Sequence, residues 1–140
     1  MKNRSLSPHG KVTIVNRLEF VAYCNEFSSE SEKAAVFDRY YNPDAVFEHP
    51  LKGSFKGKEA IVEFWTAGHK GIHEVLKPLN VLFDDDWIAA EFLIEWHCLE
   101  NTYYLGPREK GRIYYAECAA FYHLKDGKFS RVKLYLMEKK

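Results

Sequence analysis

The sequence predicts an α+β fold in which three helices come first and pack on a strongly curved antiparallel sheet. Up to about Gly68, apolar residues recur at the three- and four-residue spacing of amphipathic helices. From His73 onward the period changes to two, which is typical of strands with one buried face. Asp126-Gly127 then separates two alternating runs and is a strong signal for a two-residue hairpin turn. Helices followed by a meander of hairpins indicate a sheet that carries its helices on one side.

Length and charge limit the class of protein. The chain has 140 residues, the size of one domain with one core. We expect a mobile N-terminal tail over residues 1–9 and a single domain over residues 10–140. Lys+Arg and Asp+Glu both number 20, and a chain with zero net charge and no basic run argues against nucleic acid as a partner. No apolar stretch is long enough to span a membrane, and the N-terminus lacks the apolar segment of an export signal.

Cysteine and histidine spacings give no sign of a metal or a cofactor. Cys24, Cys98 and Cys118 have no metal or redox spacing, and an odd count without an export signal predicts reduced thiols in a cytoplasmic protein. His69 and His73 have the i, i+4 spacing with which a helix can hold a metal, but glycines interrupt the helix there and no third ligand is evident. No phosphate-binding glycine pattern is present. We therefore expect neither a metal nor a cofactor.

The first half of the chain predicts the helices. One helix is expected over residues 11–27, with its inward side formed by Ile14, Leu18, Val21 and Cys24. Ser29 and Glu32 have the spacing of a capping box, which predicts a second helix from about residue 31 to 41. Its inward side would carry Ala34, Phe37 and Tyr41. A third helix restarts after Gly57 and ends near Gly68 or Gly71.

A short strand is predicted between the second and third helices. Pro43 disfavours the α conformation for Asn42, so the chain should turn there and enter a strand over residues 45–51. Alternation places Phe47 and His49 on one face of this strand. Because Pro50 cannot donate to a strand partner, the strand is expected at an edge of the sheet.

The second half predicts four strands, over residues 73–83, 87–101, 112–125 and 128–138. The long strand has an apolar face that should point inward, formed by Ala90, Phe92, Ile94, Trp96 and Cys98. Its other face carries Glu91, Glu95 and His97, which favours an outer surface over a second acid/base group in the pocket. Leu93 on that outer face predicts a homodimer packed sheet to sheet. A polar loop is expected over residues 105–112.

Small side chains on the penultimate strand leave room under the helices. Ala116, Cys118 and Ala120 share one face, which predicts the floor of a pocket. The alternative is close packing of helices on the sheet, with Tyr114 and Tyr122 filling the space. We favour the pocket.

Two segments resemble a known family. YYNPDAVFEHPLKGSFKGKEAIVEFW and FYHLKDGKFSRVKLYL are similar to segments of the nuclear transport factor 2-like superfamily, in the branch of SnoaL-like polyketide cyclases and ketosteroid isomerases. The resemblance extends over about residues 12–138. It implies a cone-shaped, cystatin-like fold with a pocket between helices and sheet. Because this fold hosts many unrelated activities, function must be argued from the site itself.

The resemblance assigns a candidate catalytic residue. In the ketosteroid isomerases the residue before the proline that ends the first strand is an aspartate that shuttles a proton, and His49 occupies this position. A histidine titrates near neutral pH and suits this task, with its neutral form as the base. The structural alternative is a histidine that only hydrogen-bonds at the strand end.

The other catalytic groups of the isomerases have no counterpart here. The tyrosine with which they stabilise the oxyanion corresponds to a position near Phe20, with Tyr23 one turn further on, and their second aspartate corresponds to Ala120. These departures argue against ketosteroid isomerisation and put the cyclases' aldol chemistry in doubt.

The sequence thus favours a protein that binds a small hydrophobic metabolite, and leaves open whether it is an enzyme. If it is, we expect a cofactor-independent isomerase, cyclase or dehydratase that uses general acid/base catalysis on a carbonyl- or hydroxyl-bearing compound. The alternatives are a non-catalytic binding module and a structural or protein-binding homodimer. Besides His49, the residues expected to line the pocket are Phe20, Tyr23, Tyr41, Phe47, Trp65, Tyr114, Ala116, Cys118, Ala120 and Tyr122.

Overall fold

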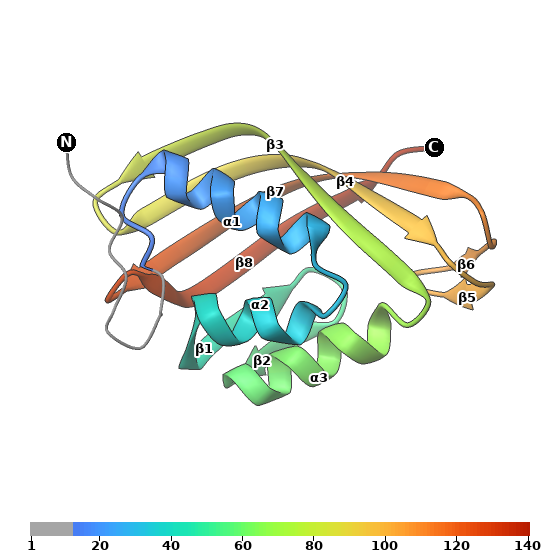
Figure 1. The fold of residues 1–140 in the computed structure, drawn as a ribbon, viewed down its shortest axis with the longest axis horizontal. Coiled ribbons are helices and arrows are strands. Elements are labelled where there is room, and N and C mark those ends of the chain that lie inside the picture. Colours follow the sequence, from blue (N-terminus) through green and yellow to red (C-terminus); the bar gives the residue numbers. More distant parts are fainter. Residues whose placement is uncertain (1–12) are drawn as a thin grey trace.

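Three helices cover one face of a curved sheet in the computed structural model, which describes residues 13–140 (Figure 1). The expected mobile tail, residues 1–9, lies outside the described residues. The helices are α1 Arg17–Ser29, α2 Lys33–Tyr40 and α3 Lys58–Gly68. The strands are β1 Tyr41–His49, β2 Gly53–Lys56, β3 Ile72–Asp84, β4 Trp87–Cys98, β5 Thr102–Tyr103, β6 Pro107–Arg108, β7 Ile113–Lys125 and β8 Lys128–Glu138. The α+β class and the cone-like arrangement of helices on a curved sheet are confirmed.

The main sheet is mixed, with strand order β2-β1-β8-β7-β4-β3. β3, β4, β7 and β8 form the expected antiparallel meander, but β1 pairs with β8 in parallel. The expectation of a purely antiparallel sheet was therefore wrong. Parallel neighbours need a long crossover connection, and residues 50–127 supply it.

β1 is an inner strand, because β2 and β8 flank it on either side. The prediction of an edge strand from Pro50 was wrong, since Pro50 lies in the turn just beyond the end of β1. β2 forms the edge instead. The predicted orientation of the strand is confirmed, because Phe47 and His49 are both buried.

The first helix turns inward a side that matches the expected one only in part: Cys24 is buried as predicted, and so is Ile14 just before the helix. Leu18 is 80% exposed, whereas the aromatic residues Phe20, Tyr23 and Phe27 are buried. The Asn16 side chain caps the helix by accepting from the Glu19 N–H at 2.9 Å. Burial of three rings outweighs burial of one leucine, since aromatic side chains remove the largest apolar area from water.

The predicted capping box before α2 is absent, because Glu32 is the N-cap and makes no side-chain capping bond.

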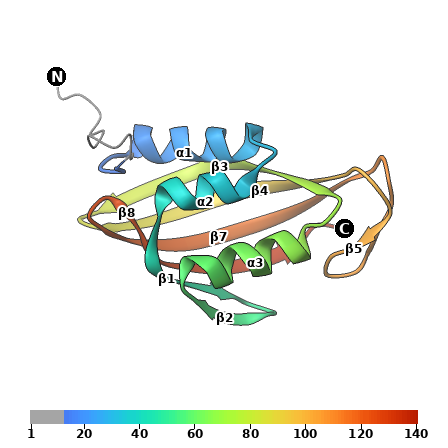
Figure 2. The same cartoon turned by 60° about the horizontal axis from the view of Figure 1, so that its bottom comes forward.

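The hairpin predicted between the last two strands is confirmed. Asp126 and Gly127 both have positive φ, 56° and 76°, as a type I′ turn requires. The predicted 87–101 strand ends earlier, at Cys98. Residues 99–112 leave the sheet and form the small β5–β6 hairpin at one end of the molecule (Figure 2). This hairpin is held against the end of α3, since Thr102 Oγ1 donates to the Lys70 carbonyl at 2.8 Å.

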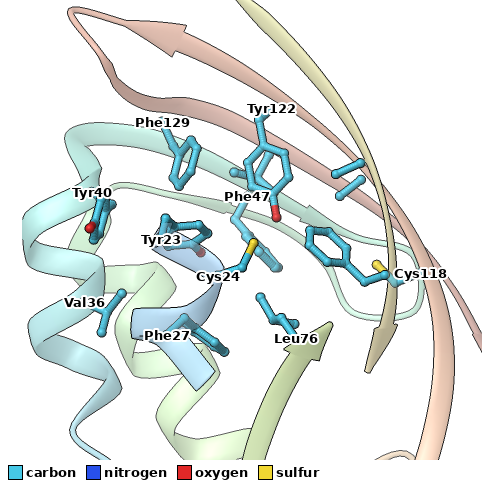
Figure 3. Close-up of a cluster of buried hydrophobic side chains, with 14 of the residues drawn as sticks. Tyr23, Cys24, Phe27, Val36, Tyr40, Phe47, Leu76, Cys118, Tyr122 and Phe129 are labelled. Carbon is cyan, nitrogen blue, oxygen red and sulfur yellow. The ribbon is translucent and has the colours of Figure 1, made fainter. Parts of the chain in front are cut away.

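The core lies between the helices and the inner face of the sheet. Figure 3 shows Tyr23, Tyr122 and Phe129 clustered between α1 and the last two strands. The ring centroids of Tyr23 and Tyr122 lie 4.9 and 4.7 Å from that of Phe129. In the described part of the chain, none of the helices is both long and apolar enough to cross a membrane.

Candidate active site

A cavity of about 50 Å³ lies inside the cone, between the helices and the inner face of the sheet. One water needs about 10–15 Å³, so the cavity has room for a few waters or a small part of a ligand. Its walls are mainly aromatic and aliphatic, and His49, His69 and Glu74 also line it. A mostly apolar cavity with a few converging polar groups is the usual form of a small-molecule site.

The structure brings together most of the residues predicted to line the pocket. Those that line the cavity with His49 are Tyr23, Tyr41, Phe47, Trp65, Cys118 and Tyr122. Phe20, Ala116 and Ala120 are buried but lie outside the lining. Phe20 packs edge-on against Tyr122, with ring centroids 5.0 Å apart.

Tyr114 lies apart from the cavity. Its hydroxyl accepts a hydrogen bond from the Glu109 N–H at 3.0 Å, and the guanidinium groups of Arg108 and Arg112 lie over its ring. It shares the inward face of β7 but lies beneath the 99–112 loop, which strand alternation alone could not reveal.

His49 ends β1 with its two ring nitrogens in different situations. Nδ1 accepts from the Leu51 N–H at 3.1 Å, while Nε2 is buried without a hydrogen-bond partner among residues 13–140. Burial lowers the pKa of His49 to about 4, with the charges of His69 and Lys52 adding to the effect. The ring is therefore neutral at pH 7. Because Nδ1 is an acceptor, the proton is on Nε2, which faces the ligand space as a hydrogen-bond donor.

His69 and Glu74 form a buried pair that the sequence did not reveal. His69 Nε2 lies 2.5 Å from Glu74 Oε1, and the two side chains are 3% and 10% exposed. His69 is the C-cap residue of α3, and the Ile72 N–H donates back to its carbonyl at 2.9 Å. Gly71 supplies the positive φ of 77° that closes this turn. The turn brings Glu74, the third residue of β3, back to the His69 ring.

One sequence signal could have found Glu74. Ile72, Glu74 and Leu76 alternate along β3 and are all buried, so a carboxylate occupies the apolar face of a strand. His69 gave no such signal, since its position depends on the turn after α3. His69 lies at the end of α3, where the glycines interrupt the helix, and His73 Nε2 lies 2.7 Å from the Ser28 carbonyl. No group of three potential metal ligands occurs within residues 13–140.

Trp96 and Tyr104 also line the cavity and were not predicted as pocket residues. Trp96 lies directly opposite Glu74 in the β3–β4 pairing, and its Nε1 is buried without a hydrogen-bond partner in the described chain. The Tyr104 ring contacts His69, with centroids 4.3 Å apart. Arg108 holds the Tyr104 loop in place by donating to the Tyr104 carbonyl at 2.8 Å and to both oxygens of Glu138.

The hydroxyl and thiol groups of the lining remain neutral. Burial raises the pKa of Tyr41, Tyr104 and Tyr122, and raises that of Cys118 to about 12. The negative charge of Glu74 adds to the rise at each of these four groups, so its field acts across the whole cavity. The cavity therefore offers hydrogen bonds and proton transfer and lacks a thiolate nucleophile at pH 7.

These features define a nuclear transport factor 2-like domain with a mostly apolar pocket between helices and sheet. The chain belongs to the SnoaL-like family: the family model for the SnoaL-like domain matches residues 20–132. No protein of curated function matches it in sequence.

Solved structures share the fold at low sequence identity. A proposed SnoaL-like polyketide cyclase from Jannaschia sp. CCS1 has a TM-score of 0.69 at 13% identity, over 96% of this chain and 91% of that one. A proposed polyketide cyclase from Pseudomonas putida KT2440 has a TM-score of 0.70 at 21% identity, over 83% and 86%. TerC, co-crystallised with polyporic acid, has a TM-score of 0.66 at 17% identity, over 84% and 88%.

Proposed function

We propose that this protein binds a small hydrophobic metabolite in the cone cavity and catalyses a cofactor-independent proton transfer on it, as an isomerase, cyclase or dehydratase. The observation that carries the proposal is the group of His49, His69 and Glu74 inside an otherwise apolar cavity. Buried polar groups are normally paired within the protein, so the unpartnered Nε2 of His49 suits a ligand oxygen. The co-crystal of the related TerC with polyporic acid supports a ligand that carries polar oxygens.

His49 remains the proposed catalytic residue, but its hydrogen bonds favour a donor over the expected base. The only nitrogen that could take up a proton is Nδ1, which already accepts from the Leu51 N–H. A donor at Nε2 would instead polarise a carbonyl or stabilise a developing oxyanion.

Hydrogen–deuterium exchange with an aryl ketone tests this function. Indanone is a suitable probe, since it is flat and mostly apolar, and the part that must enter the cavity is only its carbonyl with the adjacent C–H. We expect the protein to bind indanone, measured by tryptophan fluorescence, and to accelerate exchange of its α-hydrogens in heavy water, measured by NMR. Cys118→Leu narrows the cavity and should weaken binding. Ala119→Leu is the matched control, because Ala119 is exposed on the other face of the same strand.

Two results would redirect the proposal. Binding without acceleration by the wild-type protein would favour the non-catalytic binding module. Equal binding by Cys118→Leu and Ala119→Leu would contradict the cavity as the binding site.

We further propose a homodimer through the outer face of the sheet. Tyr115, Phe121, Tyr135 and Met137 on β7 and β8 are 40–64% exposed there. An exposed apolar face of this kind suits a self-complementary two-fold interface. Phe121→Lys should give monomers in sedimentation at micromolar concentration, whereas Leu18→Lys, at an exposed position on α1, should leave the dimer intact. A wild-type monomer at that concentration would contradict the proposal.

A further inference from the structure

We propose that His69 and Glu74 act together as the proton carrier of the cavity, with Glu74 as the base, while His49 holds the oxygen of the substrate. The substrate inferred is a neutral, flat, mostly apolar molecule with a carbonyl group next to a C–H bond. This inference rests on the proposed function and assigns the roles within the same site.

The short distance between His69 and Glu74 points to a proton between the ring and the carboxylate, although Nε2 makes no hydrogen bond of regular geometry among residues 13–140. His69 Nδ1 lies 2.9 Å from the Trp65 carbonyl, which can only accept, so Nδ1 carries a proton. In a neutral ring Nε2 would then present a lone pair to Glu74 Oε1 at 2.5 Å. Two acceptors at that distance repel each other unless a proton lies between them. The pair is therefore held together by a shared proton.

The surroundings of the ring favour placing this proton on His69. The imidazole stacks on Trp65, with centroids 3.8 Å apart and planes within 6°. The face of an indole ring attracts a cation, and the attraction is larger where water is excluded. His69 as an imidazolium leaves Glu74 ionised, and the two charges compensate each other inside the cavity.

Glu74 retains one oxygen for chemistry. Oε1 contacts His69, while Oε2 has no hydrogen bond or ion pair with any residue in the described range 13–140. Glu74 lies opposite Trp96 on the inner face of the sheet, and both residues line the cavity. A carboxylate in an apolar cavity with a free oxygen is suited to accept a proton from carbon.

The unpartnered nitrogens determine what the ligand must offer. His49 Nε2 and Trp96 Nε1 are both buried and unpartnered in residues 13–140, and both are N–H donors. A ligand that satisfies them presents acceptor oxygens, as a carbonyl or an enolate does. In this arrangement the two donors would bind the oxygen of a ketone, and Glu74 Oε2 would act on the carbon next to its carbonyl.

The step is a proton transfer without net oxidation or reduction. Glu74 Oε2 takes a proton from the carbon next to the carbonyl, and the C–H electron pair forms the new C=C bond. The carbonyl π pair moves to the oxygen, where the His49 N–H stabilises the negative charge. Return of a proton from Glu74 to a carbon, either the same proton or one exchanged with water while on the carboxyl, restores the carboxylate, so the cycle needs no co-reactant.

Nitrogen-15 NMR of the histidine side chains tests the shared proton without any ligand. At pH 7 we expect both ring nitrogens of His69 to be protonated in the wild-type protein. In Glu74→Gln, the ring should lose the proton on Nε2, because the partner is no longer charged. A wild-type spectrum with a bare Nε2 on His69 would overturn the proposal.

Deuterium exchange into indanone tests the roles. Glu74→Gln should lose roughly 10²–10⁴-fold in the exchange rate, the usual size of a general acid–base effect. His69→Asn retains a donor for the Trp65 carbonyl but removes Nε2, and should lose a comparable factor. His49→Gln can keep an N–H at the position of Nε2, so its loss should be smaller than that of His49→Leu.

The outer His97–Glu95 pair supplies matched controls. His97 Nε2 lies 2.8 Å from Glu95 Oε1 on the outer side of β4, away from the cavity. Glu95→Gln and His97→Asn should exchange indanone at the wild-type rate. Circular dichroism and thermal melting verify that each variant is folded.

The possible outcomes separate the two proposals. Exchange by Glu74→Gln at the wild-type rate would overturn the role of the pair and leave the proposed function intact. Equal and large losses in His49→Gln and His49→Leu would overturn the donor role and restore His49 as the base. If the folded wild-type protein accelerates no exchange, the proposed function fails, and the catalytic role of the pair fails with it.

Discussion

Two histidine–glutamate pairs lie on opposite sides of the sheet. The inner pair, His69–Glu74, has side chains 3% and 10% exposed and lines an apolar cavity. The outer pair, His97–Glu95, has side chains 34% and 12% exposed and is joined by Lys77, whose Nζ lies 2.7 Å from Glu95. The residue types and distances are similar, and the surroundings differ.

The difference shows why only one of the pairs is a candidate site. Water and salt screen the outer pair, and Lys77 followed by His97 lowers the pKa of Glu95, so its carboxylate is permanently ionised at neutral pH. The inner pair is removed from water, and its further polar contact in the described chain is the one from His69 Nδ1 to the Trp65 carbonyl. Burial of charge is costly, so a buried ionisable pair that lines a cavity is a candidate for function.

The largest effect expected on stability comes from breaking the inner pair. Glu74→Ala leaves the His69 ring buried without its partner, and removal of one member of a buried pair typically costs about 3–5 kcal/mol. We expect a loss of this size in the free energy of unfolding, measured by urea denaturation. Replacing both members, in the His69→Leu/Glu74→Leu double variant, should restore most of the loss, because apolar residues suit an apolar cavity.

The outer pair is the control for this measurement. Glu95→Ala should change the free energy of unfolding by less than about 1 kcal/mol, because its partners His97 and Lys77 are 34% and 54% exposed and remain solvated without it. Equal losses for Glu74→Ala and Glu95→Ala would contradict the distinction between the two sides. So would a double variant as unstable as Glu74→Ala alone.

A smaller effect is expected from the pH dependence of His49. Its pKa is about 4 in the folded protein and near 6.5 when unfolded, so the unfolded chain binds more protons between these values. Stability should therefore fall as the pH decreases from about 6.5 to about 4, and His49 should have no effect above that window. The loss is at most about 3.5 kcal/mol, since one pKa unit corresponds to about 1.4 kcal/mol.

Comparison of variants isolates this contribution. Urea denaturation at pH 7 and pH 4.5 should show a smaller acid-induced loss for His49→Gln than for the wild-type protein, because glutamine does not titrate. His123→Gln, at a half-exposed position that contacts Ser130, should retain the wild-type pH dependence. An identical pH dependence for His49→Gln and the wild-type protein would contradict the assignment of a buried, neutral His49.

The sequence by itself determined which side chains of each strand face inward. Alternation along residues 87–98 predicted the buried face of β4, and Asp126-Gly127 predicted the turn that joins β7 to β8. The inward position of His49 followed from the same alternation in β1. These features are local, because a two-residue period and the φ angles of a turn are fixed within a few residues.

Only the tertiary structure decided which elements became neighbours and which atoms met. The parallel contact of β1 with β8 joins segments more than 80 residues apart, and no period within either strand specifies it. The inward side of α1 depended on which rings the sheet could accommodate. The His69–Glu74 pair depended on the turn at Gly71, and the donor role of His49 on one bond from the Leu51 N–H. Periodicity can place a side chain on a face, but the direction of a hydrogen bond depends on the atoms that packing brings to it.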